Sequence, residues 1–258
     1  MERTDNYRIQ AQKAKSFFTT YDQEKLIAKL KLCHDETYLY PVMFSETYRI
    51  HRKTGDLHRK TEAGWADANS FGEVMVLLDL VCDSREDRFV TGKWKNMTDF
   101  GLMFHRNLTE GRVDPWAEKF QANPDGFRKA CESLNGIPFP RGDIAYTLEV
   151  FDGLCLTLQL WFGDEEFPAG LRFLWDENAL MYLKYETMHF AKGMLLQKIE
   201  ERMSFVLNAF PAGKAFGLRF LGDLSGDVLR FQSKYQHLIA IAVNFLLDIG
   251  FVQRVFAA

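Results

Sequence analysis

Residues 144–162, IAYTLEVFDGLCLTLQLWF, decide the fold class of this chain. Two apolar runs, 144–151 and 154–162, flank Asp152-Gly153, a pair suited to the two-residue type I′ turn of a β-hairpin. We predict that the hairpin begins at Asp143. We also predict that one apolar face of the sheet is formed by five of its side chains: Leu148, Val150, Leu156, Leu158 and Leu160.

Shorter strand and helix signals lie on both sides of this hairpin. The expected strands are 38–44, 46–52, 57–60 and 171–175, and the expected helices are 7–18, 26–30, 74–81, 123–134 and 186–207. Asp22 is suited to cap the second helix, and Ser70 with Glu73 forms a capping box before the third. The segment 83–115 is polar, aromatic and rich in turn residues, so we expect an irregular excursion there.

These signals predict an α+β fold, with a mainly antiparallel sheet, helices packed on one side of it, and a helical C-terminal appendage. Near residue 210 the glycines become frequent and acidic residues become scarce. We therefore divide the chain into a main domain, 1–207, and an appendage, 208–258. The run 238–252 is apolar, so we expect the appendage to pack on the main domain or on a second copy of the chain.

The composition is that of a folded soluble protein, with 258 residues, 47% hydrophobic residues and a formal charge of −3. This charge gives no overall attraction to nucleic acid or to an anionic membrane, and the apolar run 238–252 is too short to span a bilayer. The N-terminus has no apolar signal segment, so we expect a cytoplasmic protein. The four cysteines lie far apart without C-x-x-C spacing, so we expect free thiols and no metal site.

Several segments in a fixed order resemble the family known as domain of unknown function 3786. They are VLLD at 76–79, TGKW at 91–94, GDIAY at 142–146, LWFGDEEFPA at 160–169 and FLWD at 173–176. The resemblance covers about residues 7–196 and implies a protein of anaerobic bacteria and archaea. It implies no catalytic residues. Some members carry an added cysteine-rich iron–sulfur module, for which this chain has no cysteine cluster, and the sequence indicates no particular cofactor.

The acidic run Asp164-Glu165-Glu166 is the first candidate site, because it lies on a turn near Trp161 and Trp175. Crowded carboxylates can raise one another's pKa enough for acid–base chemistry, and they can also bind hard cations. Alternatively, they are solvated turn residues that accept backbone hydrogen bonds while Phe167-Pro168 packs the turn against the sheet. All three interpretations remain open at this point.

Two basic segments are further candidates. Lys93 and Trp94 could hold an anion and stack on a ring, or could form an ordinary packed turn. The spacing of their segment is not that of a P-loop. A basic hairpin could attract phosphate or an acidic partner, or could protect a sheet edge from aggregation; its residues are Arg49, His51, Arg52, Lys53, His58, Arg59 and Lys60.

Three functional hypotheses follow. The first is a non-catalytic accessory or small-ligand-binding protein of anaerobic metabolism, with the acidic turn and the Lys93–Trp94 loop as contacts. The second is an enzyme that uses the carboxylates at 164–166. The third is a protein-interaction module, in which the C-terminal helix forms a homo-oligomer or binds another protein.

Overall fold

The computed structural model describes residues 6–100 and 114–209, so the predicted appendage beyond residue 209 lies outside the described residues. The helices are α1 (Asn6–Phe18), α2 (Gln23–Leu30), α3 (Phe71–Leu78), α4 (Pro115–Gln121), α5 (Pro124–Ser133) and α6 (Tyr185–Ala209). The first six strands are β1 (Cys33–His34), β2 (Tyr38–Tyr40), β3 (Val42–Met43), β4 (Glu46–His51), β5 (Leu57–Thr61) and β6 (Gly64–Asp67). The others are β7 (Trp94–Asn96), β8 (Ile137–Pro138), β9 (Ile144–Phe151), β10 (Leu154–Trp161) and β11 (Gly170–Asp176).

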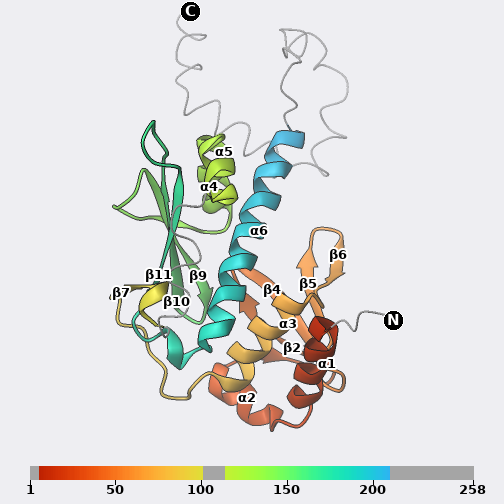
Figure 1. Cartoon of the computed structure of the whole chain (residues 1–258). Coiled ribbons are helices and arrows are strands. Elements are labelled where there is room, and N and C mark those ends of the chain that lie inside the picture. Colours follow the sequence, from red (N-terminus) through yellow and green to blue (C-terminus); the bar gives the residue numbers. More distant parts are fainter. Residues whose placement is uncertain (1–5, 101–113, 210–258) are drawn as a thin grey trace, which may run out of the picture. The chain divides into compact units, whose positions relative to one another are not determined.

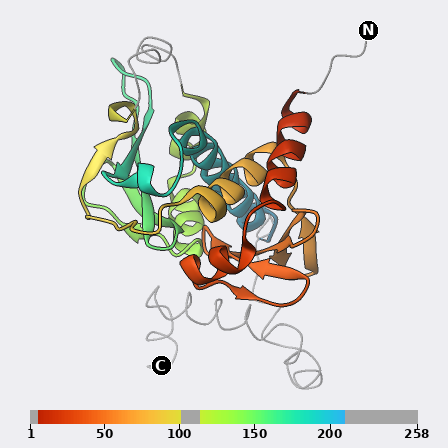
Figure 2. The same cartoon turned by 90° about the horizontal axis from the view of Figure 1, so that it is seen from below.

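The described part of the chain has the predicted α+β fold, and its antiparallel strands form two sheets. The N-terminal sheet has the order β1-β2-β4-β5-β6, with β3 paired to β4, and the C-terminal sheet has the order β7-β11-β10-β9-β8. Helix α6 lies between the sheets in both views (Figures 1 and 2) and contacts α3 and α5. The long predicted helix is therefore the central element around which the two sheets are placed.

The predicted hairpin is confirmed as β9 and β10, and Asp152 and Gly153 both have the positive φ of a type I′ turn, 48° and 82°. A β-bulge follows the turn: Leu154 pairs with Phe151, but Cys155 pairs with Glu149. The bulge changes the register, because an unbroken ladder from a two-residue turn would put Leu148 and Leu156 on opposite faces. With the bulge they are cross-strand partners, and all five predicted side chains are buried.

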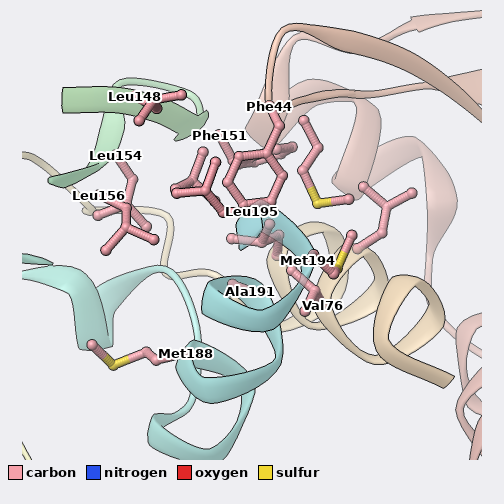
Figure 3. Close-up of a cluster of buried hydrophobic side chains, with 14 of the residues drawn as sticks. Phe44, Val76, Leu148, Phe151, Leu154, Leu156, Met188, Ala191, Met194 and Leu195 are labelled. Carbon is pink, nitrogen blue, oxygen red and sulfur yellow. The ribbon is translucent and has the colours of Figure 1, made fainter. Parts of the chain in front are cut away.

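The bulge also ties the two sheets together. Val150 is the residue that the ladder skips, and its carbonyl accepts a hydrogen bond from the backbone N–H of Phe44 at 3.0 Å. Phe44 is buried beside the hairpin and α6 in one apolar cluster (Figure 3). One face of α6 is apolar and buried throughout, and it consists of Met188, Ala191, Leu195, Ile199 and Met203. Removing this face from water is the main stabilising contribution of α6.

The helix boundaries follow the capping signals. The side chains of Asp22, Ser70 and Asn123 accept hydrogen bonds from backbone N–H groups in the first turns of α2, α3 and α5. The first helix is confirmed as α1, in which Ala11 and Phe18 are buried while Tyr7 and Phe17 are exposed. Helix α4 was not predicted, although Asp114 before Pro115 is a regular helix start.

A buried ion cluster fixes α6 on the N-terminal sheet. The Lys198 Nζ of α6 lies 2.5 Å from the Glu46 carboxylate of β4 and 3.0 Å from the Tyr48 hydroxyl. Arg59 and Arg202 also pair with Glu46, at 3.2 and 2.9 Å. Burial lowers the pKa of Lys198, and the Glu46 charge opposes that shift. The basic partners compensate the buried charge of Glu46, as a buried carboxylate requires.

Candidate functional site

The acidic turn is a closed loop between β10 and β11. The Asp164 carboxylate accepts hydrogen bonds from the backbone N–H groups of Glu166, at 2.9 Å, and Phe167, at 2.8 Å. The backbone N–H of Asp164 in turn donates to the Phe167 carbonyl at 2.8 Å. The Phe167 and Glu166 amides hold the pKa of Asp164 below its usual value. Asp164 is therefore ionised at neutral pH, and its carboxylate orders the loop.

Hydrogen bonds to residues outside the loop hold Phe162 and Gly163, just after β10, in place. The Phe162 N–H donates to the Asp143 carboxylate, and the Gly163 N–H donates to the Gln121 side chain of α4, both at 2.7 Å. Gly163 has no room for a side chain, because a Cβ there would lie 2.6 Å from the Ala169 nitrogen. The loop therefore has a backbone conformation that is set before any partner binds.

The side chains of the loop are turned outward. Trp161 and Phe162 are each 42% exposed and Phe167 is 67% exposed. Glu165 and Glu166 are also exposed, and within the described ranges neither carboxylate has a hydrogen bond or an ion pair. Three large apolar side chains and two unpaired carboxylates thus share one fixed loop, which we call the acidic–aromatic loop (residues 161–167).

The other predicted site residues lie at the far end of the C-terminal sheet, on β11 and on or next to β7. Trp175 is completely buried and pairs with Leu156, whereas Trp161 pairs with Gly170. Trp94 pairs with Asp176, six residues along β11 from Gly170, a separation of roughly 20 Å. Figure 1 shows β7 at the opposite end of the sheet from the β10–β11 loop. The structure therefore brings Trp161 together with the acidic turn and places Trp175, Lys93 and Trp94 elsewhere.

Comparison with family profiles matches residues 22–198 to the family described as Domain of unknown function (DUF3786). This span covers more than half of the chain and includes the segments from α2 to most of α6. The chain belongs to the DUF3786 family. No curated protein and no solved structure matches it.

Two of the segments that resemble DUF3786 meet at a buried carboxylate. Asp176 ends the FLWD segment, and its Oδ2 accepts hydrogen bonds from the backbone N–H groups of Thr91, at 2.8 Å, and Gly92, at 2.7 Å. Its Oδ1 accepts from the Asn178 N–H at 2.9 Å. The TGKW segment is thus fixed to β11 by a side chain that is almost inaccessible to water. Lys93 remains at the surface, paired with Glu177 at 3.4 Å.

A third DUF3786 segment, VLLD, ends in another buried carboxylate. Asp79 lies in a π-helical turn after α3, and its Oδ2 accepts hydrogen bonds from the Lys184 N–H at 2.8 Å and the Thr187 hydroxyl at 2.6 Å. Both donors lie at the start of α6, so Asp79 caps that helix from a distant part of the chain. Its Oδ1 also pairs with the Lys184 Nζ at 2.9 Å. Asp79 and Asp176 therefore join segments of the DUF3786 domain, and no signal in the sequence alone pairs them with their donors.

The basic hairpin is the remaining candidate site. In the basic hairpin, Arg52 pairs with Glu24 at 2.6 Å and Arg59 pairs with Glu46. The hairpin is not a sheet edge, because β4 and β5 are both internal strands of the N-terminal sheet.

Among residues 6–100 and 114–209 there is no group of three histidine, cysteine or acidic side chains arranged to hold a metal ion. Within the same ranges no helix is long and apolar enough to cross a membrane.

Proposed function

We propose that this DUF3786 protein is a non-catalytic binding protein and that the acidic–aromatic loop is its contact surface. The observation that carries the proposal is the joint exposure of Trp161, Phe162 and Phe167 beside two carboxylates that have no partner in the described structure. Aromatic side chains are enriched at protein interfaces, and a group of charges of one sign favours a partner of the opposite sign. The partner is therefore a basic segment of another protein, with apolar groups that cover the rings.

The preset backbone of the loop supports this proposal. Backbone N–H groups of the loop donate hydrogen bonds to the side chains of Gln121, Asp143 and Asp164, and these bonds fix the loop in the free protein. Little conformational entropy is therefore lost when a partner binds. An acid–base role for the carboxylates is less well supported, since a general acid needs a raised pKa and the pKa of Asp164 is lowered. A role in anaerobic metabolism is implied only by the organisms in which the DUF3786 family occurs. The acidic–aromatic loop adds no support for it.

Calorimetric titration with a hexa-arginine peptide tests the proposal. We expect saturable binding to the wild-type protein and binding about three- to tenfold weaker in the Glu165→Gln/Glu166→Gln double variant, because each exposed ion pair contributes up to about 1 kcal/mol. Asp164 is left in place because it orders the loop. Glu62→Gln, which removes an exposed carboxylate on the β5–β6 turn, is the matched control and should bind as the wild type does.

Two further arms distinguish other ligands. Titration with Mg²⁺ and Ca²⁺ tests the cation-site interpretation, and saturable binding of either ion that the double variant loses would replace the basic partner with a metal. Equal peptide affinity in the wild type and the double variant, or no binding of the peptide at all, would refute the proposal. Thermal unfolding of each variant checks that the fold is intact, and neither glutamine substitution removes a contact within the described residues.

A further inference from the structure

The face of the N-terminal sheet that is turned away from the core carries aromatic and basic side chains. Strand alternation turns Tyr48 and Ile50 of β4 into the core, where both are completely buried, and turns Arg49 to the other face. We call the group on that outer face the arginine–aromatic face, and it consists of five half-buried residues: Tyr38, Tyr40, Arg49, His58 and Trp65.

Arg49 is held between two aromatic rings. Its guanidinium carbon lies 4.4 Å from the centre of the Tyr38 ring and 4.6 Å from the centre of the Trp65 ring. The Tyr40 ring lies 6.1 Å from that of Trp65. The guanidinium is therefore in cation–π contact with two rings, and its N–H groups are left for another interaction.

The N–H groups of Arg49 have no partner in the described structure. Arg49 makes no hydrogen bond and no ion pair with residues 6–100 or 114–209, whereas Arg52 and Arg59 of the same hairpin each pair with a carboxylate. His58 is the direct cross-strand partner of Arg49 on β5. Both Nε of Arg49 and Nδ1 of His58 are buried without a hydrogen-bond partner. Two neighbouring side chains with unpaired nitrogens on one sheet face call for an explanation, since buried polar groups in folded proteins are almost always paired.

We propose that the arginine–aromatic face binds an oxyanion, the phosphoryl or carboxylate group of a ligand, through Arg49 with His58 as a second donor. A guanidinium fork matches the oxygens of such groups, and the flanking rings of Tyr38 and Trp65 fix its orientation in advance. The next residue in the cross-strand row, Asp67, bonds to Asn69 at 2.6 Å and places a negative charge beyond His58. The anion therefore lies toward Arg49. This site is separate from the acidic–aromatic loop and does not depend on its function.

Calorimetric titration of the full chain with sodium phosphate and with sodium citrate, at constant ionic strength, tests this site. We expect saturable binding of at least one anion, at least tenfold weaker binding in Arg49→Met, and an intermediate loss in Arg49→Lys, which keeps the charge without the fork. Arg85→Met is the control, because Arg85 is exposed and already paired with Asp87 at 2.7 Å. A preference for phosphate assigns a phosphoryl ligand, and a preference for citrate assigns a carboxylate ligand.

The lysine variant and a spectroscopic readout keep the test decisive if Arg49→Met does not fold. The buried Nε–H of Arg49 should give a side-chain ¹⁵N–¹H signal that shifts with anion concentration in the wild type, and His58→Phe should weaken anion binding while leaving the Arg49 signal present. No saturable binding of either anion, or unchanged affinity in both Arg49 variants, would overturn the proposal. Unchanged affinity in Glu165→Gln/Glu166→Gln is expected, so failure of one proposal can be distinguished from failure of the other.

Discussion

The two ends of the β10–β11 pair have similar composition and opposite roles. Each has an aspartate next to aromatic residues and near a glycine. At one end Asp164 accepts hydrogen bonds only from its own loop and stays in water. At the other end Asp176 accepts them from Thr91 and Gly92, more than eighty residues away in the chain, and is buried with Trp175.

The difference shows that the origin of the backbone donors decides what an acidic residue does in this fold. A carboxylate that bonds within its own turn leaves the neighbouring side chains free to face solvent. A carboxylate that bonds to a distant segment excludes water from both segments and becomes part of the framework. We therefore expect substitutions at Asp176 to change stability and substitutions in the acidic–aromatic loop to change binding.

Replacing Asp176 by alanine should have the largest effect on stability. The Thr91 and Gly92 N–H groups would lose their shared acceptor inside the protein, which we expect to lower the free energy of unfolding by about 3 kcal/mol. Urea unfolding measures this, with Asp87→Ala, an exposed aspartate, as the control. A loss for Asp176→Ala no larger than that of the control would mean that the two segments are not held by this carboxylate.

Gly163→Ala should have the next largest effect. The new Cβ would lie 2.6 Å from the Ala169 backbone nitrogen, so the loop would have to move, and we expect a destabilisation of about 1–3 kcal/mol. Gly170→Ala on the adjacent strand is the matched control, because a Cβ there meets nothing within 4 Å. If thermal unfolding gives the same midpoint for both variants, the backbone of the loop is not as tightly set as the structure indicates.

Asp164→Ala should have the smallest effect of the three on stability, similar to the loss of a capping side chain, because the two backbone N–H groups that lose their acceptor lie in an exposed turn. Because the folded-state pKa of Asp164 is below its unfolded value, its contribution is present above the unfolded pKa and is lost as the pH falls through the folded pKa. The difference in unfolding midpoint between wild type and variant should therefore vanish in acid. A difference that grows as the pH falls would contradict this sign. Asp164→Asn should retain most of the loop, since an amide oxygen can accept the same bonds.

Local signals in the sequence predicted much of the fold. Asp152-Gly153 predicted the hairpin turn, and Asp22, Ser70 and Asn123 predicted the starts of three helices. Each of these features is local, because its hydrogen bonds join residues within four positions of one another. The bulge at Val150 was not predictable in this way. It accompanies a hydrogen bond from Phe44, which lies in the turn between β3 and β4 and is distant in the sequence.

The candidate site could be predicted only in part for the same reason. The acidic turn and Trp161 are close in sequence and remain together in the structure. Trp175 and Trp94 were grouped with them by residue type, but strand pairing separates them along β11. Arg49 was one of seven basic residues in a hairpin, and its distinction depends on Tyr38 and Trp65 from strands on either side of it. Strand alternation places these three on one face, but it does not show that Arg52 and Arg59 are paired with carboxylates while Arg49 is not.

The indole N–H signals of the tryptophans provide the most direct test of the contrast between the two ends. A ¹⁵N–¹H spectrum recorded during titration with hexa-arginine reports on the exposed Trp161 of the acidic–aromatic loop, and on Trp94 and Trp175 at the other end. We predict that the Trp161 signal shifts saturably, while the Trp94 and Trp175 signals stay in place. Movement of the Trp94 or Trp175 signal with no change at Trp161 would contradict the assignment of binding to the acidic–aromatic loop.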